Sequence, residues 1–293
     1  MATALETPRA ERIRTPRMHD PDSMTIRCAA DIRMQLMGGR TFVMQVAHPA
    51  VGAGVHQFSS FRSDPWTRLE QIAKSGTQYL YRGEAAAYEE GRRLRRVHKN
   101  IQGVDLNGKP YHSLDPSAYG WVHTIFFDSL VSMHDLFGTP LTRDEQQRLF
   151  AEWQEGGRVF GLRDQDMPAS VDEYWEFYAD AIENTCAYTP PIEHILRMKQ
   201  NPPPKPPDLE RVPGAGWRAL WKPLGAFQHW LILATLPPRF REKIAAHHPW
   251  TPRDQRRFER FARVVRGTVP RLPAKWRIEA EARRFFAEHA RAS

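Results

Sequence analysis

Cysteine is scarce in this sequence, with only Cys28 and Cys186 in 293 residues. At most one disulfide is available, which excludes the small secreted folds that depend on several. The sequence also lacks any run of about 18 apolar residues, the length that a membrane-spanning helix requires. Its first 23 residues are polar and charged, without the apolar segment of a secretory signal. Together these absences predict a cytoplasmic protein with reduced thiols.

Segments in which apolar and polar residues alternate are rare, whereas apolar residues repeat at three- and four-residue spacing along most of the chain. The apolar content of 41% can fill a large core, which excludes general disorder. We therefore expect an all-α fold, a single globular domain of about eight to ten helices. Residues 1–22 are expected to form a flexible tail, residues 23–293 the helical domain, and residues 201–213 a proline-rich connector within it.

Capping residues and glycines set the expected helix boundaries. Asp22 or Ser23 caps a first helix that Gly38-Gly39 ends, and a buried helix follows that is interrupted near His48-Pro49. Gly103 is expected to end the helix that begins at residue 84. Further helices are expected over residues 64–81, 116–137, 143 onward, 170–184, 217–233, 252–268 and 273–290.

The net charge of +8 is distributed unevenly along the chain. From Lys205 to the end, 19 Lys and Arg residues stand against 8 Asp and Glu, a balance of +11, while the rest of the chain has a balance of −3. Such a basic half is typical of proteins that bind nucleic acid, an anionic membrane surface or an acidic ligand, and equally of a solvated arginine-rich surface. No nucleic-acid-binding motif is present, so no nucleic acid partner is expected. The tryptophan-rich residues 217–233 either touch a membrane peripherally or cover the core.

Two of the three histidines in residues 92–129, His98 and His123, lie in contrasting settings. His123 shares one face of the helix over residues 116–137 with apolar side chains at helical spacing, namely Tyr119, Val122, Phe126, Phe127 and Leu130. Another face carries Thr124, Asp128 and Ser132. His123 is therefore expected to point inward, where an imidazole needs a hydrogen-bond acceptor, a metal or a cofactor. A satisfied core histidine remains the alternative.

His98 lies on the preceding helix, on the same side as Arg95 and Gln102, with Gly91 above them. The glycine would let a flat ligand approach the backbone, and Arg95 could meet a carboxylate. The alternative is a solvated basic face. The two helices are expected to be antiparallel neighbours, with the two histidines differing in height by about 6 Å. Such a pair could enclose a porphyrin. A non-haem metal site formed by His98, His123 and Asp128 has no HExxH motif to support it.

The chain resembles the MpaB-like family, which includes the catalytic domain of rubber oxygenase (latex clearing protein), from about residue 28 to about residue 285. The most specific block is "RRVHKNIQGVDLNGKPYHSLDPSAYGWVHTIFFDS", with an Arg-x-x-His, an Asp-Pro and a Trp-Val-His helix. The order and spacing of "MQVAHPAVGAGVHQFSSFRSDPWTRL", "TLPPRFREK" and "RLPAKWRIEAEARR" agree with the family's other blocks.

The resemblance implies an all-helical protein with haem b held between central helices. Rubber oxygenases cleave carbon–carbon double bonds of polyisoprene with dioxygen, and MpaB-type members are associated with oxidative cleavage of an isoprenoid side chain. By resemblance, His123 matches the proximal iron ligand and Arg95 the arginine on the other haem face. His98 takes the place of the distal lysine of rubber oxygenases, as a distal iron ligand or a gate beside the iron. Phe127 is expected to contact the haem, and Glu84 is the nearest candidate for the family's glutamate base.

Three hypotheses follow. The first is a haem b-dependent oxygenase that acts on an apolar, isoprenoid-type small molecule with dioxygen, using Arg95 and His98 for catalysis. The second is a non-catalytic bis-histidine haem protein, a sensor or an electron carrier. The third is a basic helical protein that binds an anionic membrane or a partner without a cofactor. The sequence does not name the substrate or the oligomeric state.

Overall fold

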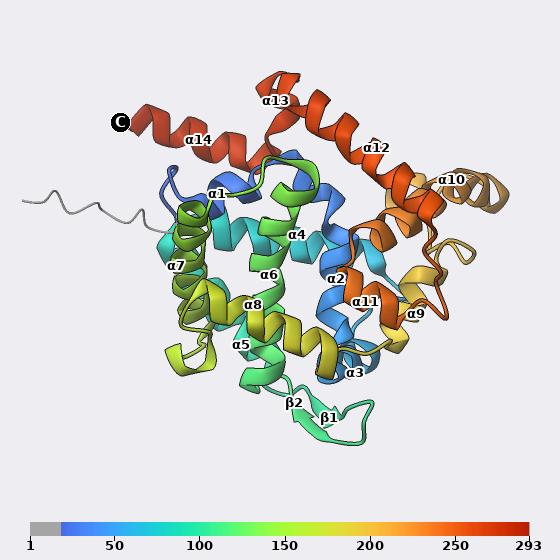
Figure 1. The fold of residues 1–293 in the computed structure, drawn as a ribbon, viewed down its shortest axis with the longest axis horizontal. Coiled ribbons are helices and arrows are strands. Elements are labelled where there is room, and N and C mark those ends of the chain that lie inside the picture. The colour runs from blue at the N-terminus through green and yellow to red at the C-terminus, as the bar shows by residue number, and fades with distance from the viewer. Residues whose placement is uncertain (1–18, 293) are drawn as a thin grey trace, which may run out of the picture.

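The structure, a computed structural model, describes residues 19–292 of the chain. These residues form fourteen α-helices, a two-stranded hairpin and short 3₁₀ and π segments arranged around the central helix α6 (Pro116–Phe137) (Figure 1). The expected all-α fold is confirmed, although the described residues form fourteen helices where about eight to ten were expected, because several of them are short segments of four to six residues. Of the expected tail, residues 1–18 lie outside the described residues. Residues 19–22 include a turn, and the His19 Nδ1–H points at the carbonyl oxygen of Leu80 at 3.4 Å.

The helices before α6 are α1 (Met24–Ala29), α2 (Gly38–Ala47), α3 (Pro49–Phe58), α4 (Pro65–Tyr81) and α5 (Glu84–His98). Those after it are α7 (Arg143–Phe160), α8 (Val171–Asp180), α9 (Pro190–Arg197), α10 (Gly214–Thr235), α11 (Pro238–Lys243), α12 (Pro252–Thr268), α13 (Ala274–Arg277) and α14 (Ala280–Ala292). The short segments are η1 (Ile32–Leu36), η2 (Asp164–Asp166), η3 (Ala181–Thr185), η4 (Pro207–Leu209) and η5 (Val269–Arg271). Strands β1 (Gln102–Val104) and β2 (Pro110–His112) pair antiparallel.

Several helix starts lie where the capping residues predict them. The Ser23 hydroxyl accepts the amide of Ile26, and Asp64 precedes Pro65 at the first position of α4. Thr142 forms a capping box with Glu145 at the start of α7. These local hydrogen bonds satisfy amides that have no partner inside the helix. The break between α2 and α3 also falls at His48-Pro49, as expected.

Three expected boundaries are wrong. Gly38-Gly39 begins α2 instead of ending the first helix. Gly39 permits close packing of α2 on α10, since a Cβ there would lie 2.5 Å from Cγ1 of Ile232. The helix that begins at Glu84 ends at His98, and Gly103 lies in β1. The expected helix 273–290 is divided at Ile278, which pairs with η1's neighbour Asp31. In the first and third cases a contact with a distant part of the chain overrides the local pattern, whereas Gly103 pairs with Tyr111 in the adjacent hairpin.

The core surrounds α6, which packs against α2, α7 and α12. The Trp121 indole N–H donates to the Met44 carbonyl at 2.8 Å, and the Tyr174 hydroxyl of α8 donates to the Thr124 carbonyl at 2.7 Å. Helix α6 is thus covered on nearly every side, which explains a sequence that is apolar around most of its circumference. Because α6 lies at the centre of the fold, the face that carries His123 and the face that carries Asp128 are both buried.

The proline-rich connector is packed against its neighbours. The carbonyls of Pro203 and Pro204 accept the indole N–H groups of Trp217 and Trp66 at 2.9 and 2.7 Å. In α10, Trp217, Trp221 and Trp230 are all buried. The tryptophans of residues 217–233 therefore serve the packing of the core and the connector, which is the second of the two expectations for that segment.

Candidate functional site

His123 lies in the second turn of α6 and is 6% exposed. Its Nε2–H donates to the carbonyl oxygen of Trp153 on α7 at 2.7 Å. Since a carbonyl can only accept, this bond places the proton on Nε2 and leaves a lone pair on Nδ1. Nδ1 is buried and has no hydrogen-bond partner among residues 19–292. Burial lowers the pKa of His123 to about 4, against the opposing effect of the Trp153 bond, so the ring is neutral at pH values near neutrality.

Trp153 fixes His123 by two further contacts. The Trp153 indole N–H donates to the His123 carbonyl at 3.0 Å, and the two rings are stacked with centroids 4.7 Å apart and planes 13° apart. Gly157, one turn along α7, lies under the imidazole, and a Cβ there would be 3.1 Å from His123 Nε2. That Cβ would also overlap Sδ of Met167. The ring is therefore held between α6 and α7 in one orientation.

Arg95 and His98 occupy the last turn of α5. The His98 Nδ1–H donates to the Leu94 carbonyl at 2.7 Å, which leaves the lone pair on Nε2. Burial is the largest of the effects that lower the pKa of His98. Its ring centroid lies 6.0 Å from that of Tyr119, which is one helical turn before His123 on α6. The structure thus places His98 beside Tyr119, which lies one helical turn before His123.

Arg95 differs from the other arginines of α5. Arg92 and Arg96 form ion pairs with Glu89, and Arg93 pairs with Glu90. Arg95 is half-buried and has no carboxylate within ion-pair distance among residues 19–292. Its guanidinium fills the space where a side chain at Gly161 would be, and Gly161 has a φ of 90° that favours glycine. A half-buried guanidinium without a carboxylate partner is a candidate group for binding an anionic ligand.

The expected pairing of α5 with α6 needs correction. Helix α5 packs mainly against α4 and α7, and its contacts with α6 are fewer. Gly91 does not face a ligand, because a Cβ there would overlap the Val159 carbonyl of α7. Gln102 lies in β1 and not on the helical face of His98. Side chains of α6 and α7, Tyr119 and Phe160, lie against the two histidine rings.

The expected faces of α6 are also partly wrong. Phe126 is 46% exposed, while Thr124 and Asp128 are 2% and 1% exposed. Asp128 forms a buried ion pair with Arg40 of α2, whose Nη2 donates to Oδ1 at 2.9 Å. The Asp128 carboxylate thus pairs with Arg40 and does not form a metal site with His98 and His123. Within residues 19–292, no group of three or more His, Cys, Asp or Glu side chains could hold a metal ion.

Phe127 is fully buried, with its ring edge against Tyr174 at 4.6 Å and near Trp153 at 6.1 Å. It therefore packs among the rings that surround Trp153. His48 lies between α2 and α3 with its ring 6.3 Å from Trp121, and burial lowers its pKa. His48 Nδ1, like Nδ1 of His123, is buried without a hydrogen-bond partner among residues 19–292.

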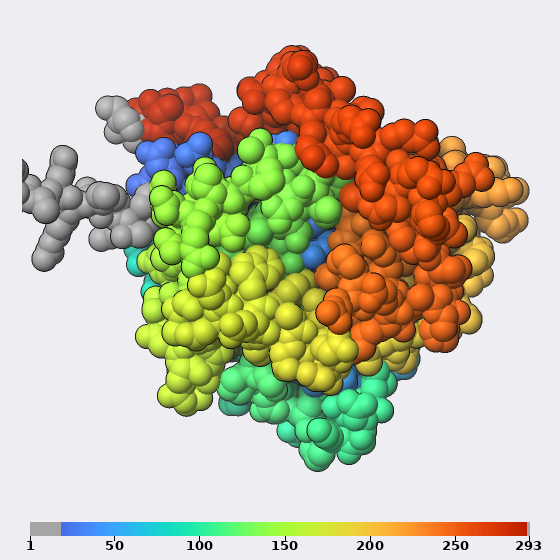
Figure 2. Space-filling view, in the orientation of Figure 1, coloured from blue at the N-terminus to red at the C-terminus, as the bar shows by residue number. Residues whose placement is uncertain are grey.

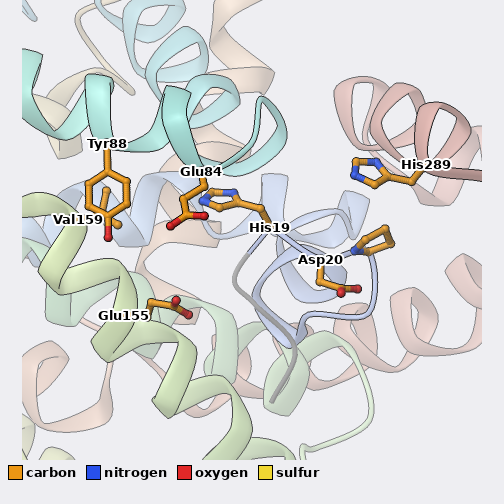
Figure 3. Close-up of a pocket in the computed structure, with 8 residues that line it drawn as sticks. His19, Asp20, Glu84, Tyr88, Glu155, Val159 and His289 are labelled. Carbon is orange, nitrogen blue, oxygen red and sulfur yellow. The ribbon is translucent and has the colours of Figure 1, made fainter. Parts of the chain in front are cut away.

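Two cavities lie among the described residues. One of about 400 Å³ lies beside Trp153 and is lined by Gly120 and Thr124 of α6 and by Met167, Glu173 and Phe177. The other, of about 230 Å³, contains Glu84. Figure 3 shows Glu84 next to His19, with Glu155 of α7 below them and His289 of α14 farther off. Glu84 begins α5 whereas Arg95 and His98 end it, so the expected base lies in a pocket away from them.

The sequence reasoning did not single out Trp153, Gly157 or Met167. The sequence does mark Gly157 as unusual, because Gly156-Gly157 interrupts a segment that is otherwise rich in strong helix formers. Both glycines are buried inside α7.

The family model described as "ER-bound oxygenase mpaB/B'/Rubber oxygenase, catalytic domain" matches residues 26–267, most of the chain. The chain belongs to this family. As a member of the mpaB/rubber oxygenase catalytic-domain family it is an oxygenase, an enzyme class that uses dioxygen and a small-molecule substrate. No curated protein and no solved structure matches the chain. Within residues 19–292, no helix has both the length and the apolar content needed to cross a bilayer.

Proposed function

We propose that this protein is a haem b-dependent oxygenase that acts on an apolar, isoprenoid-type small molecule with dioxygen. The observation that carries the proposal is the buried lone pair of His123 Nδ1, which no donor in the structure satisfies. A ligating histidine requires one ring nitrogen free for the metal and the other anchored by an acceptor. His123 has that arrangement, with Nε2 anchored on the Trp153 carbonyl.

The surrounding residues fit a porphyrin in two further respects. Arg95 is a half-buried cation without a carboxylate partner among the described residues, and it would hold a propionate. Aromatic side chains at the site, including Trp153, Phe160 and Tyr119, provide apolar surface of the kind that encloses a haem ring. Haem b, when bound, would supply the iron that activates dioxygen.

The chain's own groups would orient the reactants and move protons. His123 would fix the cofactor, with Trp153 preventing rotation of its ring. Burial lowers the pKa of His98, which favours its neutral form. With Nδ1–H bonded to the Leu94 carbonyl, the lone pair of Nε2 would be the proton acceptor. The cavity beside Trp153 has a mixed lining, in which the apolar side chains of Met167 and Phe177 could contact an apolar substrate and Asp166 and Glu173 add carboxylates. The free, buried thiols of Cys28 and Cys186 support a reducing, cytoplasmic location.

A second candidate function is a non-catalytic haem protein with two histidine ligands. It is favoured by the likeness of His98 to His123, since in each ring one N–H donates to a backbone carbonyl and the other nitrogen keeps its lone pair. Such a site would carry electrons or sense a ligand without oxidising a substrate.

The test is reconstitution of the purified protein with haemin, followed by absorption spectroscopy. The wild type should develop a Soret band, His123→Ala should not, and His134→Ala, a control on the same helix, should behave as the wild type. Absence of the band in the wild type would reject both haem functions. Dioxygen consumption with squalene, lost in His98→Ala, supports the oxygenase. A six-coordinate spectrum that carbon monoxide does not change supports the carrier.

A further inference from the structure

The corner formed by α12, η5 and α13, residues 260–277, exposes apolar side chains to solvent. Val264 is 60%, Leu272 41% and Trp276 61% exposed. Large apolar groups are seldom left this exposed together, and a cluster of them marks an interaction surface. Trp276 contrasts with the buried tryptophans of α10, which pack in the core.

The same corner is strongly basic. Residues 260–277 contain no Asp or Glu. Its six cationic side chains are all exposed, and none forms an ion pair with another of the described residues 19–292; they are Arg260, Arg263, Arg266, Arg271, Lys275 and Arg277. Lys275 Nζ lies 5.7 Å from the centroid of the Trp276 ring. Charge and apolar surface are therefore interleaved on one short segment.

The corner projects from the body of the protein. In Figure 1, α12 runs along the upper edge of the molecule and leads into α13 at its top. The space-filling view shows this segment as a raised ridge with no other part of the chain above it (Figure 2). A ridge suits contact with a broad, flat surface better than a concave groove would.

We propose that the α12–α13 corner docks the protein on the surface of an anionic lipid bilayer. Cations near such a surface gain energy from acidic headgroups, while Trp276, Leu272 and Val264 can enter the boundary between headgroups and acyl chains. Tryptophan is suited to this boundary because its ring is apolar and its N–H is polar. Residues 260–277 include none of the haem-site residues, and the inference does not depend on the proposed cofactor.

Two other occupants are less suited to the corner. A second copy of the chain, meeting it symmetrically, would place six cations against six cations. A nucleic acid would neutralise the cations but gives no apolar phase to the three exposed side chains. Only the bilayer interface satisfies both components. An oxygenase docked in this way would be positioned to collect an apolar substrate that is dissolved in the membrane.

Flotation of the full-length protein with vesicles tests the proposal. Vesicles of phosphatidylcholine with about 25% phosphatidylserine should bind it, and vesicles of phosphatidylcholine alone should bind at least about tenfold less. Replacing Arg260, Arg263 and Arg266 together by Glu should reduce the partition coefficient at least about 100-fold. The matched control replaces three exposed cations elsewhere, Lys109, Arg148 and Arg211, by Glu and should lose far less.

Trp276→Ala should weaken binding about tenfold. Phe58→Ala should not, because Phe58 is 53% exposed but lies outside the corner. All of these positions are at the surface, so the thermal unfolding of each variant should match that of the wild type. Equal binding to both vesicle types, or equal loss in the two triple variants, would overturn the proposal. Tighter binding to a DNA duplex than to the vesicles, sensitive to the corner variants, would assign the surface to nucleic acid instead.

Discussion

Trp153 and His123 hold each other through a reciprocal pair of hydrogen bonds across the contact between α6 and α7. The imidazole N–H of His123 donates to the Trp153 carbonyl at 2.7 Å, and the indole N–H of Trp153 donates to the His123 carbonyl at 3.0 Å. The stacked rings complete the contact. Because each residue satisfies the other's polar groups inside the core, the tautomer and the orientation of His123 are both fixed by one neighbour.

Trp153→Phe should preserve an aromatic ring against His123 while removing the indole donor. The His123 carbonyl would lose a buried hydrogen bond, so the free energy of unfolding should fall by about 1–3 kcal/mol. If His123 binds haem, the looser ring should also change the Soret position of the reconstituted protein. Urea unfolding and absorption spectra check both effects, with Trp276→Phe on the surface as the control. An unchanged spectrum together with a lowered stability would limit Trp153 to a structural role.

Gly157→Ala should disturb His123 through its added methyl group. The Cβ would lie 3.1 Å from His123 Nε2 and would overlap Met167 Sδ, so one of the two side chains must move. We expect haem affinity to fall by at least about tenfold and Gly157→Ala combined with Met167→Ala to recover part of it. Haem titration followed by absorbance measures this.

The matched control for that substitution is Gly76→Ala in α4, where a Cβ meets nothing within 4 Å. There the alanine should leave haem affinity unchanged and raise stability by about 0.4–1 kcal/mol, because it restricts the unfolded chain. A loss of affinity at Gly76 equal to that at Gly157 would show that the effect is general and not a contact with His123.

The helices of this protein were predictable where local hydrogen bonds decide them. Asp64 with Pro65 and the Thr142–Glu145 box set the starts of α4 and α7 from within four residues. The inward direction of His123 followed from apolar neighbours at helical spacing, and its burial confirms it. Such features depend only on short sequence separations, which a single sequence contains.

The partners of His123 and Asp128 depend on long separations and could not be predicted in this way. Trp153 is 30 residues from His123, and Arg40 is 88 residues from Asp128. Asp128 was expected on a polar face because it lies among Thr124 and Ser132, yet α6 is covered on that side too. The packing of α5 on α7 in place of α6 has the same origin, since nothing local specifies which of two amphipathic helices a third will contact.

The lowered pKa of His123 predicts a stability that depends on pH. Its pKa is about 4 in the folded protein because of burial, against 6.5 for the exposed group, so the unfolded chain binds more protons between these values. The free energy of unfolding should therefore fall as the pH is lowered through this window. For the cofactor-free protein, His123 should account for about 2 kcal/mol of the difference between about pH 7 and about pH 5.

Urea unfolding of the wild type and of His123→Gln at both pH values checks this prediction. The variant removes the titrating group and keeps a side chain that can donate to the Trp153 carbonyl, so its pH dependence should be smaller by that amount. Other buried histidines contribute equally to both proteins and cancel in the comparison. Phe58→Ala, at an exposed side chain that does not titrate, serves as the control and should retain the wild-type pH dependence. Identical slopes for the wild type and His123→Gln would contradict a buried, neutral His123.

The Arg40–Asp128 pair should prove far more sensitive to substitution than an ion pair at the surface. Both side chains are almost fully buried, at 3% and 1% exposure, and Arg40 also donates to the Thr235 carbonyl at 2.7 Å, which joins α2, α6 and α10. Asp128→Asn leaves the guanidinium without its counter-charge in the core and should cost about 3–5 kcal/mol. Asp172→Asn, which breaks an exposed pair with Arg143, should cost at most about 1 kcal/mol. Asp128 binds Arg40 and does not contact His123, so a folded Asp128→Asn variant should bind haem with wild-type affinity. Loss of the Soret band in the folded variant would instead place Asp128 in the haem site.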